Sequence, residues 1–174
     1  MKKVAIVGLL ALGCFLAGCG TTTTATTAAG GNWEVILASE GPSPVNETLF
    51  NFETTFSVNN TGALTVTNLN FLTAGPCFPV TGLGETVGGT FDVTSAPSDP
   101  TATANVTFTV NGNGNALALT GTATGVTNTV AQTTTWNAVI GTWTLTGSSN
   151  CTLGITSPGG TFTMCPNSVT CSTT

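Results

Sequence analysis

Apolar and polar residues alternate along most of the chain from Trp33 onward. Trp33, Val35 and Leu37 fall on one phase of a period of two, and Phe52 and Phe56 fall on one phase of the next segment. A period of two places successive side chains on opposite faces of a β-strand. No window carries apolar residues at the i, i+3, i+4 and i+7 spacing of an amphipathic helix. The chain is therefore predicted to be all-β.

Turn residues separate the predicted strands, of which there are eight or nine. Asn59-Asn60-Thr61-Gly62 predicts a hairpin turn, and the Asn/Gly run 111–115 predicts a second one. In the third strand the inward phase changes near Asn68, which predicts a bulge. The expected strands cover about 33–38, 50–58, 64–71, 87–93, 104–110, 117–119, 130–136, 139–146 and 161–164.

Short connections between successive strands predict an antiparallel meander. A meander of eight strands loses its exposed edges when it closes into an up-and-down barrel, and a two-layer sandwich is the alternative. Residues 32–174 are too few for two domains of ordinary size, so we expect a single all-β domain.

Gly31-Asn32-Trp33, at the start of the first predicted strand, resembles the Gly-x-Trp of lipocalins and avidins. In those families the Trp closes one end of an antiparallel barrel. Lipocalins usually pair this Trp with an Arg, and this sequence has no Arg. The resemblance implies a barrel whose first strand begins at a plugged end.

Large side chains on the apolar phase of several strands are expected to gather inside such a barrel. They either fill it as a core or line a cavity for an apolar small molecule. Glu85 shares the phase of the apolar residues that follow it, so its carboxyl group is expected to point inward. The candidate ligand-lining residues are Trp33, Glu85, Phe91, Phe108 and Trp143.

The N-terminal segment carries Lys2 and Lys3, an apolar run over residues 4–17, and the tetrapeptide Leu16-Ala17-Gly18-Cys19. This tetrapeptide resembles the lipobox of bacterial lipoproteins. The resemblance implies cleavage before Cys19, acylation of Cys19 and a lipid-anchored, extracytoplasmic protein of the cell envelope. Gly20, in place of Asp after the acylated Cys, implies the outer membrane if the host has one.

Three regions follow from this reading. Residues 1–18 form a signal peptide, residues 19–31 form the acylated Cys and a tether of Thr, Ala and Gly, and residues 32–174 form the all-β domain. The tether has no large apolar residue and no charge, so we expect a flexible coil that reaches about 20 Å.

Removal of residues 1–18 takes away both Lys residues and leaves seven Asp and Glu with no Lys, Arg or His. The net charge of −5 then becomes −7. A polyanion such as nucleic acid is excluded as a partner, because its binding depends on Lys and Arg. Serine and cysteine nucleophiles lack a His or Lys base. We therefore expect no catalysis, no metal and no cofactor.

Six Cys occur, and four remain after Cys14 is removed and Cys19 is acylated. An even number in an exported chain predicts two disulfides, with three pairings open in principle. Cys165 and Cys171 are close enough in sequence to close a local loop, which leaves Cys77 for Cys151.

These features predict a membrane-anchored binding or envelope-structural module that does not catalyse a reaction. Its expected partners are the membrane, through the lipid, and an apolar small molecule or another envelope component. One alternative is a carboxylate-dependent hydrolase, in which Glu34 and Glu53 of neighbouring strands would converge. The other is an adhesive surface protein that assembles with itself.

Overall fold

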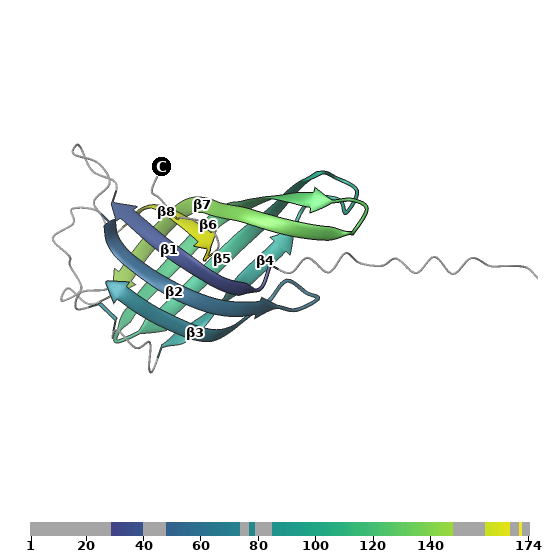
Figure 1. Ribbon diagram of the computed structural model, residues 1–174. Helices are drawn as coiled ribbons and strands as arrows, with labels where there is room; N and C mark the ends of the chain where they lie inside the picture. Colours follow the sequence, from purple (N-terminus) through teal and green to yellow (C-terminus); the bar gives the residue numbers. More distant parts are fainter. Residues whose placement is uncertain are drawn as a thin grey trace, which may run out of the picture.

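The computed structural model forms an eight-stranded antiparallel barrel (Figure 1). It describes residues 29–39, 48–73, 77–78, 85–147, 159–167 and 171. Within these ranges no helix is long and apolar enough to cross a membrane. The strands are β1 (Gly31–Ser39), β2 (Thr48–Val58), β3 (Leu64–Thr73), β4 (Thr86–Val93), β5 (Thr101–Gly112), β6 (Asn115–Asn128), β7 (Thr133–Gly147) and β8 (Gly159–Pro166).

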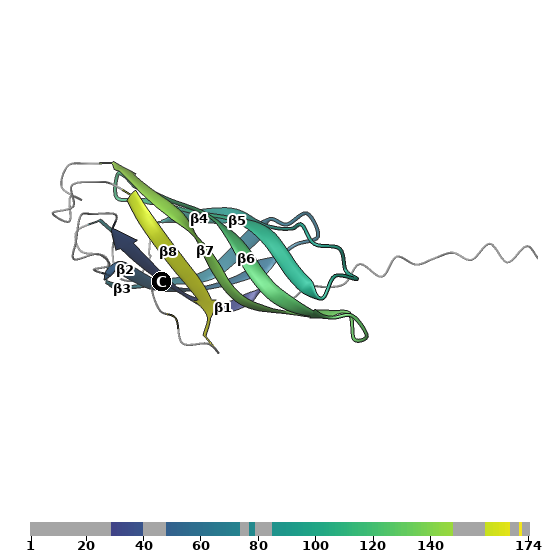
Figure 2. The ribbon, with the colours of Figure 1, turned by 90° about the horizontal axis from the view of Figure 1, so that it is seen from above.

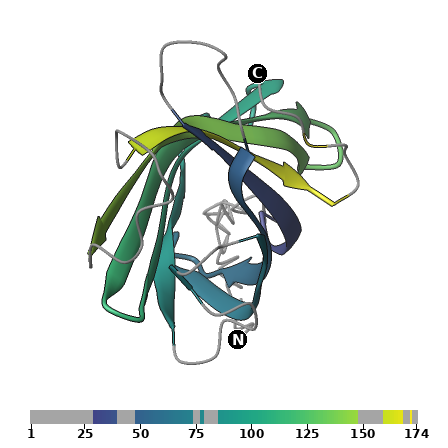
Figure 3. The same cartoon turned by 90° about the vertical axis from the view of Figure 1, so that its left-hand side faces the viewer.

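The strands follow one another around the barrel in meander order, as predicted. Their order in the sheet is β3-β2-β1-β8-β7-β6-β5-β4, so pairing of β1 with β8 joins the two ends of the chain. Figure 3, which looks along the barrel, shows the strands surrounding a common interior. Between β3 and β4 the described residues pair only at Ala63 and Thr90, with a 2.7 Å hydrogen bond from Phe91 N to Gly62 O. The barrel is therefore nearly closed.

Local sequence signals explain the turns and the third strand. Asn113 and Gly114 both have positive φ, 51° and 75°, which suits a two-residue hairpin loop between β5 and β6. In β3, Asn68 pairs with Thr55 but Val66 pairs with Phe56, so Thr67 is an extra residue. This bulge moves the inward phase from Val66 to Leu69, which confirms the predicted change near Asn68.

Three of the predicted strands are wrong in extent. The segments 130–136 and 139–146 are one strand, β7, and residues 129–132 form the turn before it. The apparent break is a bulge, because Gly125 pairs with Trp136 and Thr124 with Ala138, which leaves Asn137 unpaired. The preceding strand, predicted only over 117–119, continues as β6 to Asn128. Its second half is mostly Gly, Thr and Ala, which give little apolar alternation.

The interior of the barrel is filled with aromatic and aliphatic side chains from every strand. Ring contacts run through it, such as those of Phe52 with Phe71 at 5.2 Å and with Phe108 at 5.8 Å between centroids. Such pairs stabilise the fold by about 0.5–1.5 kcal/mol beyond their area burial. The largest fully buried side chains are Trp143, Phe52, Phe71, Phe91, Phe108, Leu37, Leu117, Leu119, Met164, Val35 and Val106.

A pair of glycines makes room for the ring of Phe162. Gly121 and Gly141 are register partners in β6 and β7, and Gly141 also pairs with Phe162 in β8. A Cβ atom on Gly121 would lie 2.9 Å from Phe162 Cζ, and one on Gly141 would lie 2.8 Å from Phe162 Cε1. The ring therefore packs directly over the two Gly backbones, where any side chain would displace it.

Two cysteine predictions concern the described residues. Cys165 and Cys171 form a disulfide, as predicted. Cys171 Sγ lies 3.9 Å from Glu34 O and 3.8 Å from Thr163 O, so the disulfide lies against the paired strands β1 and β8. Cys77 is also disulfide-bonded, and its predicted partner, Cys151, lies outside the described residues.

Replacement of Gly141 by Ala is expected to destabilise the barrel. The new methyl group would collide with the Thr120 carbonyl and the Phe162 ring, and overpacking of this kind costs about 1–3 kcal/mol. Gly88→Ala in β4 is the control, because a Cβ atom there meets nothing within 4 Å. Urea unfolding, monitored by circular dichroism, should show a lower free energy of unfolding for Gly141→Ala and no such decrease for Gly88→Ala. Equal effects of the two changes would contradict this packing.

Candidate binding site at the tryptophan end of the barrel

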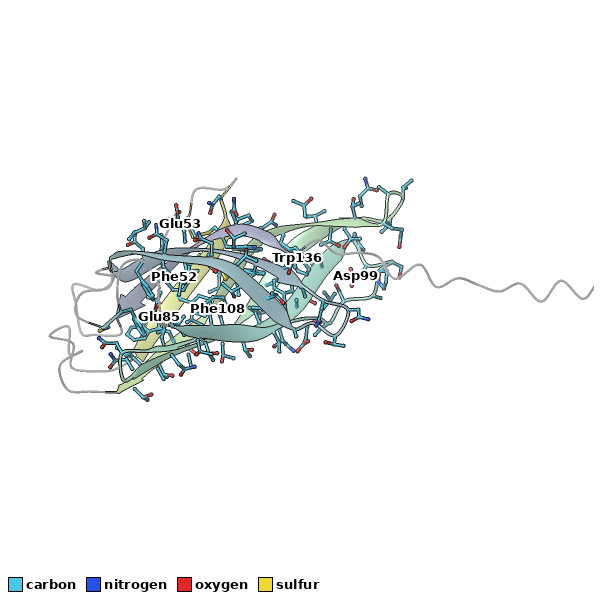
Figure 4. The ribbon with its side chains drawn as sticks, turned by 90° about the horizontal axis from the view of Figure 1, so that it is seen from below. Phe52, Glu53, Glu85, Asp99, Phe108 and Trp136 are labelled. Atoms are coloured by element: carbon cyan, nitrogen blue, oxygen red, sulfur yellow. A yellow bond between two sulfur atoms is a disulfide. The ribbon has the colours of Figure 1, made fainter. Side chains whose placement is uncertain are left out.

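The barrel has two chemically different ends. One, here called the tryptophan end, contains Trp33 at the start of β1 and Trp136 near the start of β7. The other, here called the Glu85 end, contains the residue that precedes β4. Figure 4 shows Glu85 and Trp136 toward opposite ends of the ribbon, with Phe52 and Phe108 between the strands.

Four of the five candidate ligand-lining residues point inward and are buried. The exposed fractions are 2% for Trp33, 2% for Phe91, 1% for Phe108 and 1% for Trp143. Side chains that line a ligand cavity keep surface that water can touch, and these keep almost none. The sequence left open whether these side chains fill the barrel as a core or line a cavity, and their burial favours a filled core.

The fifth candidate, Glu85, lies half-buried beside the β5–β6 hairpin. A Cβ atom on Gly112 would lie 2.6 Å from Glu85 Cγ, so the side chain rests on that Gly. Its Oε2 atom is buried and has no hydrogen-bond partner. Burial raises the pKa of the Glu85 carboxyl above its ordinary value of 4.5, and a backbone hydrogen bond opposes part of this shift.

The β3–β4 connection contributes a plug at the same end of the barrel. Phe78 is 3% exposed and stacks on Phe71 with 4.9 Å between ring centroids. The Cys77 carbonyl accepts a 2.9 Å hydrogen bond from Asn115 Nδ2. The sequence predicted a break in the sheet around residues 74–79, but the inward position of Phe78 was not predicted.

The tryptophan end is closed by a cluster of four rings. Trp33 stacks on Phe56 at 5.9 Å and lies 6.4 Å from Phe91, and Phe91 meets Trp136 edge-on at 4.8 Å. The indole of Trp33 donates a 3.1 Å hydrogen bond to the Ala29 carbonyl. The position of Trp33 at one end of the barrel is the one that the Gly-x-Trp resemblance implied.

An open pocket of about 400 Å³ adjoins this ring cluster. It lies where β8 leaves the sheet: β8 pairs with β1 as far as Pro166, but with β7 only as far as Met164. Figure 2 shows β8 beside β7, and the β6–β7 hairpin extending beyond it. The lining residues are Gly30, Gly31, Asn32, Trp33, Thr134, Thr135, Trp136, Pro166 and Asn167.

Trp136 differs from the other two tryptophans in its hydrogen bonding. Trp33 Nε1 and Trp143 Nε1 donate to the carbonyls of Ala29 and Ala38, at 3.1 Å and 2.8 Å. Trp136 is 4% exposed, and its buried Nε1 has no hydrogen-bond partner. An unpaired buried donor costs about 1–3 kcal/mol, and such a group in a folded protein needs an explanation.

Among the acidic residues that the structure describes, only two face each other. Glu34 and Glu53 are register partners on the outer faces of β1 and β2, so the two acids that the sequence placed on neighbouring strands do lie opposite each other. Glu85 lies apart from them, before β4. Among the described residues, no three Asp, Glu, Cys or His gather as metal ligands.

Sequence reasoning missed the pocket. Trp136 was assigned to a strand, but nothing in the sequence indicated that β8 would end beside it. The available signal was Pro166-Asn167, because Pro has no N–H for the ladder and disfavours continued pairing. Cys19, the predicted lipidation site, lies outside the described residues.

Comparisons of the chain with protein-family models, curated proteins and solved structures found no match. The site is therefore interpreted from its own chemistry.

Protonation of Glu85 is expected to stabilise the fold. Its pKa is higher in the folded protein than in the unfolded chain, so the stabilising contribution is present at low pH and is lost as pH rises through the folded pKa. Glu85→Gln, which is always neutral, should raise the melting temperature at pH 7 by about 1–3 °C. At pH 3.5 residue 85 is neutral in both proteins, so their melting temperatures should be the same. If Glu85→Gln changed the melting temperature by the same amount at both pH values, the raised pKa of Glu85 would be contradicted.

Proposed function

We propose that the protein is a non-catalytic module of the cell envelope, anchored by acylated Cys19, that binds its partner through the pocket at the tryptophan end. The observation that carries the proposal is the contrast between interior and surface. The interior side chains are buried against one another, whereas the pocket beside Trp33 and Trp136 is open and has about 400 Å³ of volume. That volume lies within the range of small-molecule sites.

The pocket lining supports binding without catalysis. It contains Gly, Asn, Thr, Trp and Pro side chains and no Asp, Glu, His, Lys, Arg or Cys. General acid–base and nucleophilic mechanisms depend on a titratable or activated group at the site. What the lining offers to a ligand is amide and hydroxyl groups for hydrogen bonds, because the indole rings of Trp33 and Trp136 are only 2% and 4% exposed.

The position of the pocket relative to the proposed anchor supports the same function. Ala29 and Gly30 lead into β1 at the tryptophan end, and Gly30 lines the pocket. Nine residues lie between Cys19, which carries the proposed lipid, and Ala29, so an extended chain spans at most about 35 Å between them. We propose that the pocket is held near the membrane surface, where it meets components of the envelope.

Replacement of Cys19 by Ser is expected to abolish anchoring. Ser has no thiol for the diacylglycerol, so the chain should lose incorporation of labelled fatty acid and the unprocessed precursor should accumulate. The matched control is Cys14→Ser, which changes a Cys of the same segment outside the lipobox and should leave labelling intact. Retained labelling of Cys19→Ser would remove the basis for a lipid anchor.

A further inference from the structure

We propose that the pocket at the tryptophan end binds an uncharged glycan, one of whose oxygen atoms accepts a hydrogen bond from Trp136 Nε1. This inference rests on the proposed function, which it makes specific by naming the class of ligand. It is carried by three properties of the pocket: its neutrality, its hydrogen-bonding groups and the unpaired indole donor.

The neutrality of the pocket selects an uncharged ligand. None of the nine lining residues is ionisable, and the protein without residues 1–18 has a net charge of −7 with no Lys or Arg. An anionic ligand would meet no positive partner and would be repelled by the protein as a whole. A cationic ligand would find no carboxylate in the lining to pair with.

The polar groups of the lining match hydroxyl chemistry. Asn32, Asn167, Thr134 and Thr135 carry amide and hydroxyl groups, which both donate and accept hydrogen bonds. Asn32 Oδ1 accepts a 2.7 Å hydrogen bond from Thr55 Oγ1, which fixes the orientation of its amide at the pocket rim. Sugar hydroxyls likewise donate and accept hydrogen bonds.

Trp136 supplies the specific contact. An indole N–H only donates, so its partner must offer an acceptor oxygen. The Nε1 atom is covered in this structure, and the ring lies over Gly125, where a Cβ atom would be 3.1 Å from Trp136 Cε3. A ligand oxygen therefore reaches Nε1 only with a shift of the indole ring. Binding should consequently change the fluorescence of Trp136.

An extended peptide is the competing ligand, because the start of β7 has no partner on the β8 side. Register pairs between β7 and β8 begin at Val139, which leaves residues 133–138 as an edge within the described structure. The bulge at Asn137 interrupts this edge, and a bulge disrupts the regular ladder that an added strand needs. The glycan is therefore favoured over the peptide.

The test uses the full-length protein in detergent and its intrinsic fluorescence, since Trp33, Trp136 and Trp143 are its only tryptophans. The neutral probes are N-acetylated chitotetraose, cellotetraose and maltotetraose. The charged probe is tetragalacturonate, and the peptide probe is acetyl-Thr-Val-Thr-Val-amide. We expect a saturable change with at least one neutral tetrasaccharide and none with the other two probes.

Three variants locate the binding, and their affinities are measured by isothermal titration calorimetry because Trp136→Phe removes the fluorescent reporter. Trp136→Phe keeps a ring but removes the N–H, and should weaken binding by about tenfold, the loss of one good hydrogen bond. Asn32→Ala alters an exposed lining residue outside the core and should also weaken binding. Trp143→Phe is the control, because Trp143 Nε1 already donates to Ala38 O and lies outside the lining, so the affinity should not change.

The proposal is overturned if no neutral tetrasaccharide gives a saturable change, if tetragalacturonate or the peptide binds instead, or if Trp143→Phe weakens binding as much as Trp136→Phe. Fatty-acid labelling at Cys19 is measured in a separate experiment that does not depend on glycan binding. Failure of glycan binding with labelling retained would leave an anchored module with another ligand, whereas loss of labelling would remove the anchor itself.

Discussion

The absence of side-chain cations from the barrel is the constraint on which the rest of the structure depends. The only Lys residues are Lys2 and Lys3, so no two residues of the described strands can form a side-chain ion pair with each other. Stability therefore comes from apolar burial, neutral hydrogen bonds and the disulfides. Neutral hydrogen bonds are illustrated by two cross-strand pairs of threonine hydroxyls. Thr90 and Thr107 lie 3.0 Å apart on the outer face, and Thr134 lies 3.2 Å from the buried Thr127.

The same constraint explains why the interior is rich in rings. Aromatic side chains bury the largest apolar area per residue, and here they meet one another from the Trp33–Phe91–Trp136 cluster at one end to the Phe71–Phe78 stack at the other. Where a ring needs more room, the backbone provides it through Gly, as under Phe162. A core filled in this way leaves the outer pocket as the better candidate for binding.

Much of the fold could be predicted because each signal was local. The period of two gave the strand faces, Asn-Gly gave the β5–β6 turn, and the phase change near Asn68 gave the bulge in β3. The errors arose where the signal was weak or ambiguous. The second half of β6 carries Gly, Thr and Ala with little alternation, and the bulge at Asn137 looked like a break between two strands.

The candidate site could be predicted only in part. Trp33 lies inside the barrel, as its phase along β1 indicated, whereas Glu85 precedes β4 and is only half-buried. The pocket itself depends on where β8 stops pairing with β7 while it still pairs with β1, a strand far from both in sequence. The unpaired N–H of Trp136 follows from the same arrangement and has no signature along the chain.

The most direct test of a barrel held together without ion pairs is its stability as a function of salt. We predict that the melting temperature at pH 7 does not fall between about 0.05 M and about 1 M NaCl, because salt has no attractive pairs to screen and it screens the repulsion between Glu34 and Glu53, which lie opposite each other. A clear fall in melting temperature over this range would contradict the account.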